Sequence, residues 1–150
     1  MAKGDVMIKL PTIIIDTREQ KPYTFKGYKV VRKVLKAGDY SMSNRQALVL
    51  IERKSLADLY GTLTRKTNFE RFIKELEKLK FAKYPFLMLD CSPSHVHTGF
   101  SYSMANGGAV LDKLMRICCM YGVQVIFAGN REMSERLVLS IFNAVITIEP

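Results

Sequence analysis

The sequence contains no long hydrophobic run. None of its apolar stretches approaches the ~20 residues that a membrane-spanning helix requires. The first ten residues include Lys3, Asp5 and Lys9, which interrupt any apolar core of a secretory signal. We therefore expect a soluble, intracellular protein with no membrane partner.

Cysteine is also scarce. The three cysteines, Cys91, Cys118 and Cys119, cannot all pair within one chain, and no two of them have the CxxC spacing of a thiolate zinc site. Cys118 and Cys119 lie in the apolar pattern of a predicted helix. Buried, reduced thiols explain this pattern better than a disulfide framework or a thiolate metal site does.

Internal repeats and linker-like segments are missing as well. With 150 residues, 48% of them hydrophobic and 25% charged, the chain has the length and composition of one folded domain. We therefore expect a single domain over residues 1–150.

Acidic residues are outnumbered, with 14 Asp and Glu against 23 Lys and Arg, a formal net charge of +9. The excess lies in residues 1–83, which hold 19 bases and 9 acids (net +10), whereas residues 84–150 hold 4 bases and 5 acids (net −1). A basic half favours a polyanionic partner such as nucleic acid. A solvated basic surface kept for solubility is the alternative, and charge alone does not decide between them.

Hydrophobic periodicity predicts an α/β fold. We expect a sheet of about five strands with helices on both sides. The expected strands are residues 13–15, 28–35, 47–51, 86–89 and 123–128. Helices are expected from Ser55 to about Leu63, from a capping box at Thr67 to Leu79, from about 109 to 121, and from near Ser134 onward, with a loop over 92–108. In the second helix, Arg71, Lys74, Glu75 and Lys78 should face water.

Three strands deliver a carboxylate at or near one end: Asp16, Asp39 and Glu52. Residues two apart in a strand share a face, so Glu52 and Lys54 should project together while Arg53 points away. Such a group of hard oxygen ligands suits Mg²⁺ or Mn²⁺, and a lysine beside it suits phosphodiester hydrolysis. Glu-x-Lys alone is weak, because an exposed ion pair at a strand end has the same pattern.

The complete string is more specific. Gly38-Asp39 followed by Glu52-Arg53-Lys54 and Asp58 resembles the GDx(n)ERKx(3)D motif of the XPF family of structure-specific DNA endonucleases, which have the restriction-endonuclease-like PD-(D/E)xK fold. Asp16-Thr17-Arg18-Glu19 is similar to the family's D-x-R-E element. The resemblance covers about residues 11–130.

The resemblance implies roles for these residues. Asp39 and Glu52 would hold the metal ion, assisted by the main-chain carbonyl of Arg53 and with Asp16 close by. Lys54 would serve the attacking water. The predicted catalytic set is Asp16, Glu19, Asp39, Glu52, Arg53, Lys54 and Asp58. Asp58 has a rival role as the acidic member of the Ser55 capping box.

DNA contacts are expected from Arg18, Arg65, Lys66 and Arg71. An ordinary ion pair at the strand exit is the alternative for Arg18 and Glu19, and solvation is the alternative for Arg65 and Lys66. The aromatic residues near these bases, Tyr23, Phe25 and Phe69, are expected to lie in the core.

Family members usually carry a helix-hairpin-helix module, and some carry a helicase; this sequence has neither. The family implies a homodimer, or a heterodimer with a related subunit, formed through the last helix. We expect a metal-dependent endonuclease that cuts branched, flap or fork DNA in repair or recombination. The alternative is a catalytically silent subunit that binds DNA or pairs with an active nuclease.

Overall fold

The computed structural model describes residues 9–150; Lys3 and Asp5, on which the expectation about a signal sequence partly rests, lie outside the described residues. The strands are β1 (Ile13–Asp16), β2 (Val30–Lys33), β3 (Tyr40–Met42), β4 (Val49–Lys54), β5 (Tyr84–Leu89) and β6 (Gln124–Phe127). The helices are α1 (Leu56–Thr64), α2 (Lys66–Leu79), α3 (Pro93–Thr98), α4 (Gly107–Tyr121) and α5 (Arg131–Ile148). The strands form one sheet in the order β2-β1-β3-β4-β5-β6. The α/β class is confirmed.

The sheet has one strand more than the roughly five expected. Strand β3 has only three residues, all buried, so it shows no readable alternation in the sequence. Its central residue is polar, and the Ser41 hydroxyl donates to the main-chain oxygen of Val49 at 2.6 Å. This bond satisfies a polar group that would otherwise be costly to bury.

Strand β3 runs antiparallel to both of its neighbours, β1 and β4, whereas the other pairings are parallel. The carboxyl ends of β1, β4 and β5 therefore lie at the same edge of the sheet as the amino end of β3. Asp16 ends β1, Asp39 immediately precedes β3, and Glu52 to Lys54 end β4. Sheet topology thus gathers acids that are distant in sequence.

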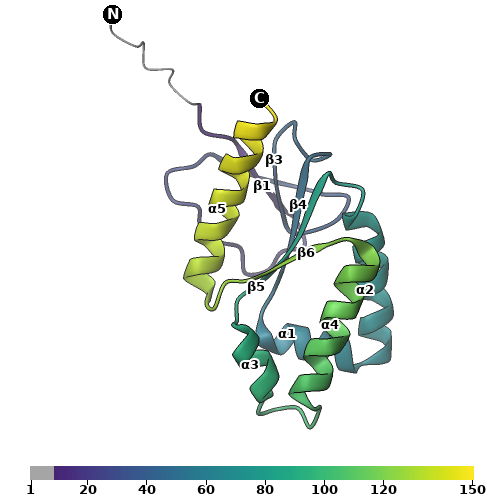
Figure 1. The fold of residues 1–150 in the computed structure, drawn as a ribbon. Helices are drawn as coiled ribbons and strands as arrows, with labels where there is room; N and C mark the ends of the chain where they lie inside the picture. Colours follow the sequence, from purple (N-terminus) through teal and green to yellow (C-terminus); the bar gives the residue numbers. More distant parts are fainter. Residues whose placement is uncertain (1–8) are drawn as a thin grey trace, which may run out of the picture.

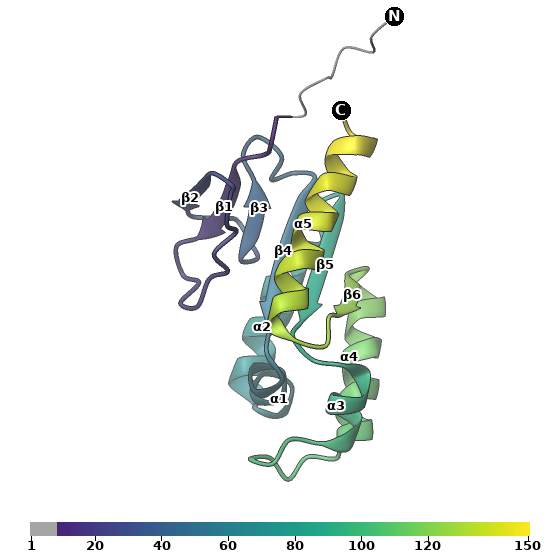
Figure 2. The same cartoon turned by 90° about the vertical axis from the view of Figure 1, so that its left-hand side faces the viewer.

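Two hydrophobic cores cover the two faces of the sheet. Helices α1, α2 and α4 pack on one face with Ile14, Leu50 and Leu87. Helix α5 packs on the other face with Ile51 and Met88, and Figures 1 and 2 show it lying across the sheet on the side away from α2 and α4. Because side chains alternate along a strand, Glu52 continues the face of Leu50, and Arg53 continues the face of Ile51.

Several helix boundaries differ from the expected ones. Helix α2 begins at Lys66, so Thr67 lies inside it and opens no capping box; the chain bends at Arg65, which has extended backbone angles. The expected loop 92–108 contains α3, because Ser92 and His95 form a reciprocal capping box with Pro93 at the first helical position. Asn130, rather than a residue near Ser134, caps α5.

Two of the expected buried thiols, Cys91 and Cys118, are buried and unpaired, but Cys119 is exposed, because it falls on the outer face of α4. Within residues 9–150, no helix combines the length and the apolar character needed to cross a bilayer.

Gly38 lies where the chain turns into β3, and its conformation has no room for a side chain. Its φ is +78°, and a Cβ there would lie 2.9 Å from the main-chain oxygen of Ile51 and 3.2 Å from Cδ1 of Leu79. We expect Gly38→Ala to lower the free energy of unfolding by about 1–2 kcal/mol from the positive φ alone, with a further loss from the backbone clash. The corresponding fall in Tm is roughly 2–8 °C.

Gly27→Ala is the matched control, since Gly27 has a φ of +87° but nothing within 4 Å of the added Cβ. Thermal unfolding of both variants separates the clash from the backbone strain. Equal losses of stability would contradict the close approach of Gly38 to β4.

Candidate active site

A cleft of about 560 Å³ opens at the edge of the sheet where the acids meet. Figure 2 shows α1 and α2 beside the end of β4 from which the chain enters α1. Most of the lining residues are polar or charged. They are Asp16, Arg18, Gly38, Asp39, Glu52, Lys54, Ala57, Asp58, Gly61, Thr62, Arg65, Asn68, Arg71, Phe72 and Glu75.

Asp39 is fixed in the cleft by the main chain of β4. Its own N–H donates to the oxygen of Ile51 at 2.7 Å, and its Oδ2 accepts from the N–H of Arg53 at 2.8 Å. The residue before it is held as well, because the N–H of Gly38 donates to Oε1 of Glu75 at 2.9 Å. The Asp39 carboxylate is therefore oriented without the help of a cationic side chain.

Glu52 lies across the β3–β4 pairing from Asp39. Its side chain is only 14% exposed, and Nζ of Lys54 lies 4.0 Å from its Oε1. The same ammonium group lies 5.0 Å from the centre of the Phe72 ring. Glu52 and Lys54 thus occupy the same face of β4, as the alternation of the strand predicts.

The environment of these two acids disfavours their charged forms. Burial raises the pKa of Asp39 to about 7, although the hydrogen bond from Arg53 opposes the rise. Burial, followed by repulsion from Asp39, raises the pKa of Glu52 well above its ordinary value. Two partly desolvated carboxylates with one nearby ammonium group form a site in which a further cation is stabilising.

Asp16 has a different environment. Its Oδ1 accepts from the main-chain N–H and from Nε of Arg18, and its Oδ2 accepts from the N–H of Leu35 at 2.7 Å. Burial alone would raise the pKa of Asp16, but the hydrogen bonds from Arg18 and Leu35 outweigh it and lower the pKa. To bind a metal ion, Asp16 would have to give up some of these partners, so its role as a ligand stays a prediction.

Arg53 points to the opposite face of the sheet from the cleft. Its side chain is 11% exposed, and its Nε donates to Oδ2 of Asp90 at 2.9 Å. The Tyr23 hydroxyl donates to Oδ1 of the same carboxylate at 3.1 Å, and Oε2 of Glu19 lies 4.0 Å from the guanidinium. Arg53 and Glu19 do not line the cleft, but the Glu19 carboxylate is near enough to repel Asp39 and Glu52 and so contributes to their raised pKa values.

The predicted DNA-contacting residues divide in two. Arg18, Arg65 and Arg71 line the cleft, whereas Lys66 does not. Asp58 also lines the cleft and is exposed, and its main-chain N–H donates to Oγ of Ser55. Half of the expected capping box is therefore present, because Ser55 caps α1 through its hydroxyl.

The expectation that Glu75 faces water is wrong. Glu75 turns into the cleft because it accepts the N–H of Gly38. Glu75, Asp90 and Tyr23 were not among the predicted site residues. A signal for Glu75 was present, since Asn68, Arg71, Phe72 and Glu75 follow the helical spacing of one face. Nothing local in the sequence pairs Asp90 with Arg53, 37 residues earlier.

The donor set of Asp39 and Glu52 fits a hard divalent cation. In the described part of the chain, no group of three or more His, Cys, Asp or Glu residues is arranged to hold a metal ion. Magnesium is commonly bound by one or two carboxylates, with water and substrate phosphate filling the remaining positions. Within residues 9–150, the Glu52 carboxylate accepts no hydrogen bond, and the Asp39 carboxylate accepts one, from the main-chain N–H of Arg53. Carboxylate oxygens therefore remain free for such an ion.

Comparison with known proteins identifies the family. A family model described as the ERCC4 domain matches residues 15–141. The chain belongs to the ERCC4 domain family. This assignment confirms the resemblance to the XPF nucleases, and it places the ERCC4 domain described here in a family of DNA structure-specific endonucleases.

Solved structures agree on the fold of this ERCC4 domain. XPF from Aeropyrum pernix has a TM-score of 0.68 and 18% identity, covering 93% of this chain and 66% of that chain. The same protein in complex with DNA has a TM-score of 0.67 and 20% identity, covering 91% and 65%. The restriction-endonuclease-like arrangement is thus confirmed at the level of the fold.

A curated relative from Methanocaldococcus jannaschii, whose name describes an ATP-dependent RNA helicase, is 28% identical to the ERCC4 domain over 131 residues. The match covers 86% of this chain but only 15% of that protein. The chain spans about two thirds of the solved XPF chains as well.

Removal of Asp90 should destabilise the ERCC4 domain, because it leaves the Arg53 guanidinium buried without its carboxylate. We expect Asp90→Ala to cost about 3 kcal/mol of unfolding free energy, measured by urea denaturation. Lys83→Ala is the control, since it breaks an ion pair with Glu149 in which the lysine is largely exposed, and it should cost far less. Similar losses in the two variants would show that the Arg53–Asp90 pair is not a structural support.

Proposed function

We propose that this domain is a divalent-metal-dependent endonuclease that hydrolyses DNA phosphodiester bonds. The observation that carries the proposal is the pair of partly desolvated carboxylates, Asp39 and Glu52, facing Lys54 in a cleft lined by three arginines. Membership of the ERCC4 family supports it. The basic half of the sequence, with a net charge of +10 over residues 1–83, supplies general attraction to the DNA backbone.

In this proposal, Asp39 and Glu52 hold Mg²⁺ or Mn²⁺. When bound, the ion supplies charge neutralisation and a water molecule of lowered pKa. Arg65 and Arg71, both exposed at the cleft, bind phosphate groups and position the strand. Attack forms one water oxygen–phosphorus bond and breaks the bond to the leaving deoxyribose oxygen; the attacking water gives up one proton to solvent, and the leaving oxygen takes up one proton from solvent.

Lys54 has two compatible roles beside the attacked phosphate. Its ammonium group donates a hydrogen bond that positions the water, and it offsets the charge that develops on the phosphate oxygens. Packing against Phe72 and the 4.0 Å approach to Glu52 restrict where the ammonium group lies. This restriction favours a fixed catalytic position over a mobile surface lysine.

Other residues of the site position these groups. Asp16 holds Arg18 at the cleft, Glu75 holds the turn before Asp39, and Arg53 orients the Asp39 carboxylate through its main-chain N–H. Glu19 lies 4.0 Å from the Arg53 guanidinium, and its negative charge adds to that of Asp39 and Glu52. Asp58 remains a candidate for contact with the ion or its waters from the first turn of α1.

We also propose that the domain functions inside the cell as a dimer, on branched, flap or fork DNA in repair or recombination. Helix α5 supports the dimer, since Met133 and Ile148 are exposed on it while its inner face fills one core of the sheet. The second candidate function is a silent subunit that binds DNA without cutting it. The intact set of Asp39, Glu52 and Lys54 favours catalysis.

Cleavage assays test this proposal. We expect the wild-type domain to cut labelled flap, fork or duplex DNA in Mg²⁺ or Mn²⁺, and Glu52→Gln and Lys54→Ala each to reduce the rate by about 100-fold or more. Glu70→Gln and Lys74→Ala, exposed on α2 outside the cleft, are the matched controls and should cut normally. If the wild type binds DNA but leaves every substrate intact, the silent-subunit function is correct.

Metal binding should stabilise the domain increasingly as the pH rises. The raised pKa values of Asp39, about 7, and of Glu52 mean that both acids are protonated at low pH in the metal-free fold. The contribution of Asp39 to stability is complete below the pKa of the unfolded chain and is lost as the pH rises through about 7. The contribution of Glu52, whose pKa is also raised, has the same sign. Cation binding requires ionised carboxylates. A bound cation therefore stabilises the fold most at the higher pH values, where the metal-free protein is destabilised by the charges of these acids.

We therefore expect Mn²⁺ to raise Tm more at a pH of about 8 than at a pH of about 5.5. Asp39→Asn should abolish the increase, whereas Glu70→Gln should retain it. A shift in Tm that is independent of pH, or one that survives Asp39→Asn, would place the ion elsewhere.

A further inference from the structure

A second hollow, of about 330 Å³, borders the cleft along α1. We call it the aromatic hollow. Its lining comes from α1, the bend after it and the loop between α3 and α4, and consists of Ala57, Tyr60, Gly61, Thr64, Arg65, Phe100, Tyr102, Ser103 and Met104. Three of these residues, Ala57, Gly61 and Arg65, also line the cleft. A ligand strand that leaves the cleft over Arg65 therefore passes directly into the aromatic hollow.

Three aromatic rings contact one another in sequence in this hollow, the first buried in the core and the last exposed to solvent. Tyr60 is buried, and its hydroxyl donates to the main-chain oxygen of Val96 at 2.6 Å. Phe100 lies against it with the ring centres 5.7 Å apart, and Tyr102 meets Phe100 edge-on at 5.5 Å. Tyr102 itself is 90% exposed. The outermost ring is thus supported by packed rings but has an open surface.

The loop that carries Tyr102 is held on both sides. The N–H of Ser103 donates to the oxygen of Phe100 at 2.9 Å, and the N–H of Ala105 donates to the Ser103 hydroxyl at 3.2 Å. Asn106 then caps α4. These contacts restrict the ring before any ligand binds, which lowers the entropy cost of stacking on it.

The chemistry of the aromatic hollow fits one kind of ligand. Its lining contains apolar and aromatic surface, two small hydroxyl side chains and the guanidinium of Arg65, but no carboxylate. A flat apolar ring attached to an anion matches this lining, because the ring stacks on Tyr102 and the anion meets Arg65. A base within a paired duplex is already stacked and does not present its face.

We propose that the aromatic hollow binds one unpaired nucleobase of the DNA strand whose phosphate lies at Arg65. This inference rests on the proposed function and specifies its substrate class: DNA with at least one unpaired nucleotide beside the cleft. Two observations carry it together, the exposed Tyr102 ring on its aromatic support and the residues that the hollow shares with the cleft. The alternative occupant of the hollow is an apolar side chain of a partner protein, and the test must distinguish it from a nucleobase.

Binding without metal ion tests the inference independently of catalysis. We compare single-stranded oligonucleotides containing 2-aminopurine with a fully paired duplex, in EDTA, for wild type, Tyr102→Ala and Tyr102→Trp. We expect Tyr102→Ala to weaken single-strand binding roughly 10-fold or more and to remove the fluorescence change that reports stacking. Tyr102→Trp should retain both, and duplex binding should change little.

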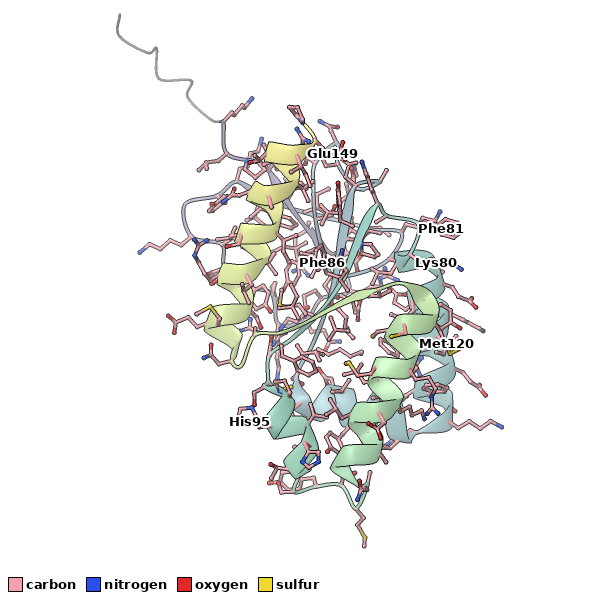
Figure 3. All side chains as sticks on the ribbon, in the orientation of Figure 1. Lys80, Phe81, Phe86, His95, Met120 and Glu149 are labelled. Atoms are coloured by element: carbon pink, nitrogen blue, oxygen red, sulfur yellow. The ribbon has the colours of Figure 1, made fainter. Side chains whose placement is uncertain are left out.

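Phe81→Ala is the matched control, since Phe81 is an aromatic residue that is 71% exposed and lines neither the cleft nor the aromatic hollow. Figure 3 shows Phe81 far from His95 of α3, the helix that precedes the loop carrying Tyr102. The control should bind single strands as the wild type does. Because Tyr102 is so exposed, its replacement should leave Tm unchanged.

The outcomes separate this inference from the proposed function. Unchanged single-strand binding by Tyr102→Ala, or an equal loss on paired and unpaired DNA, overturns the stacking site even when the wild type cuts DNA. The absence of any single-strand binding by the wild type also overturns it, and leaves a partner protein as the occupant of the hollow. A selective loss in Tyr102→Ala with no cleavage by the wild type supports the stacking site while the nuclease proposal fails.

Discussion

The site depends on the pairing of β3 with β4. Asp39 lies immediately before β3. Its N–H donates to the main-chain oxygen of Ile51 and its carboxylate accepts from the main-chain N–H of Arg53, so the backbone of β4 holds the carboxylate beside Glu52. Within residues 9–150, the ammonium group of Lys54, 4.0 Å from Glu52, offsets only part of the cost of burying the two acids. The two carboxylates therefore repel each other at this edge of the sheet, and a bound cation is the ligand that relieves the repulsion.

Side chains alternate along β4, so residues with different roles lie on opposite faces of the sheet. Glu52 and Lys54 enter the cleft, while Arg53 between them joins Asp90 and Tyr23 behind the sheet. One three-residue segment thus provides chemistry on one face and support on the other. The main-chain N–H of Arg53 connects the two, since it holds Asp39 while the side chain of the same residue is fixed by Asp90.

Much of this arrangement could be predicted from the sequence, because strand alternation and the ends of apolar runs are local signals. They placed Glu52 and Lys54 together and Arg53 apart, and they gave the class of the fold. Strand β3 was missed because three buried residues carry no periodicity. Glu75 was assigned to the solvated face because its partner is a main-chain N–H 37 residues away. The helical spacing of Glu75 with Arg71 and Phe72 indicates a shared face, but nothing near Glu75 in the sequence indicates that this face borders Gly38.

The hairpin formed by β3 and β4 has a consequence for how such domains change over evolution. Asp39 and Glu52 are neighbours across the open end of the hairpin, and the connection between the strands, residues 43–48, closes its other end. That connection is held by other parts of the fold, since the N–H of Ser43 donates to Thr12, the oxygen of Ala47 accepts from Lys83, and Arg45 donates to the main-chain oxygen of Glu149. A single insertion inside Glu52-Arg53-Lys54 would exchange the two faces of the strand. Both ends of the hairpin are therefore constrained, but only an insertion near the acids changes which side chains enter the cleft.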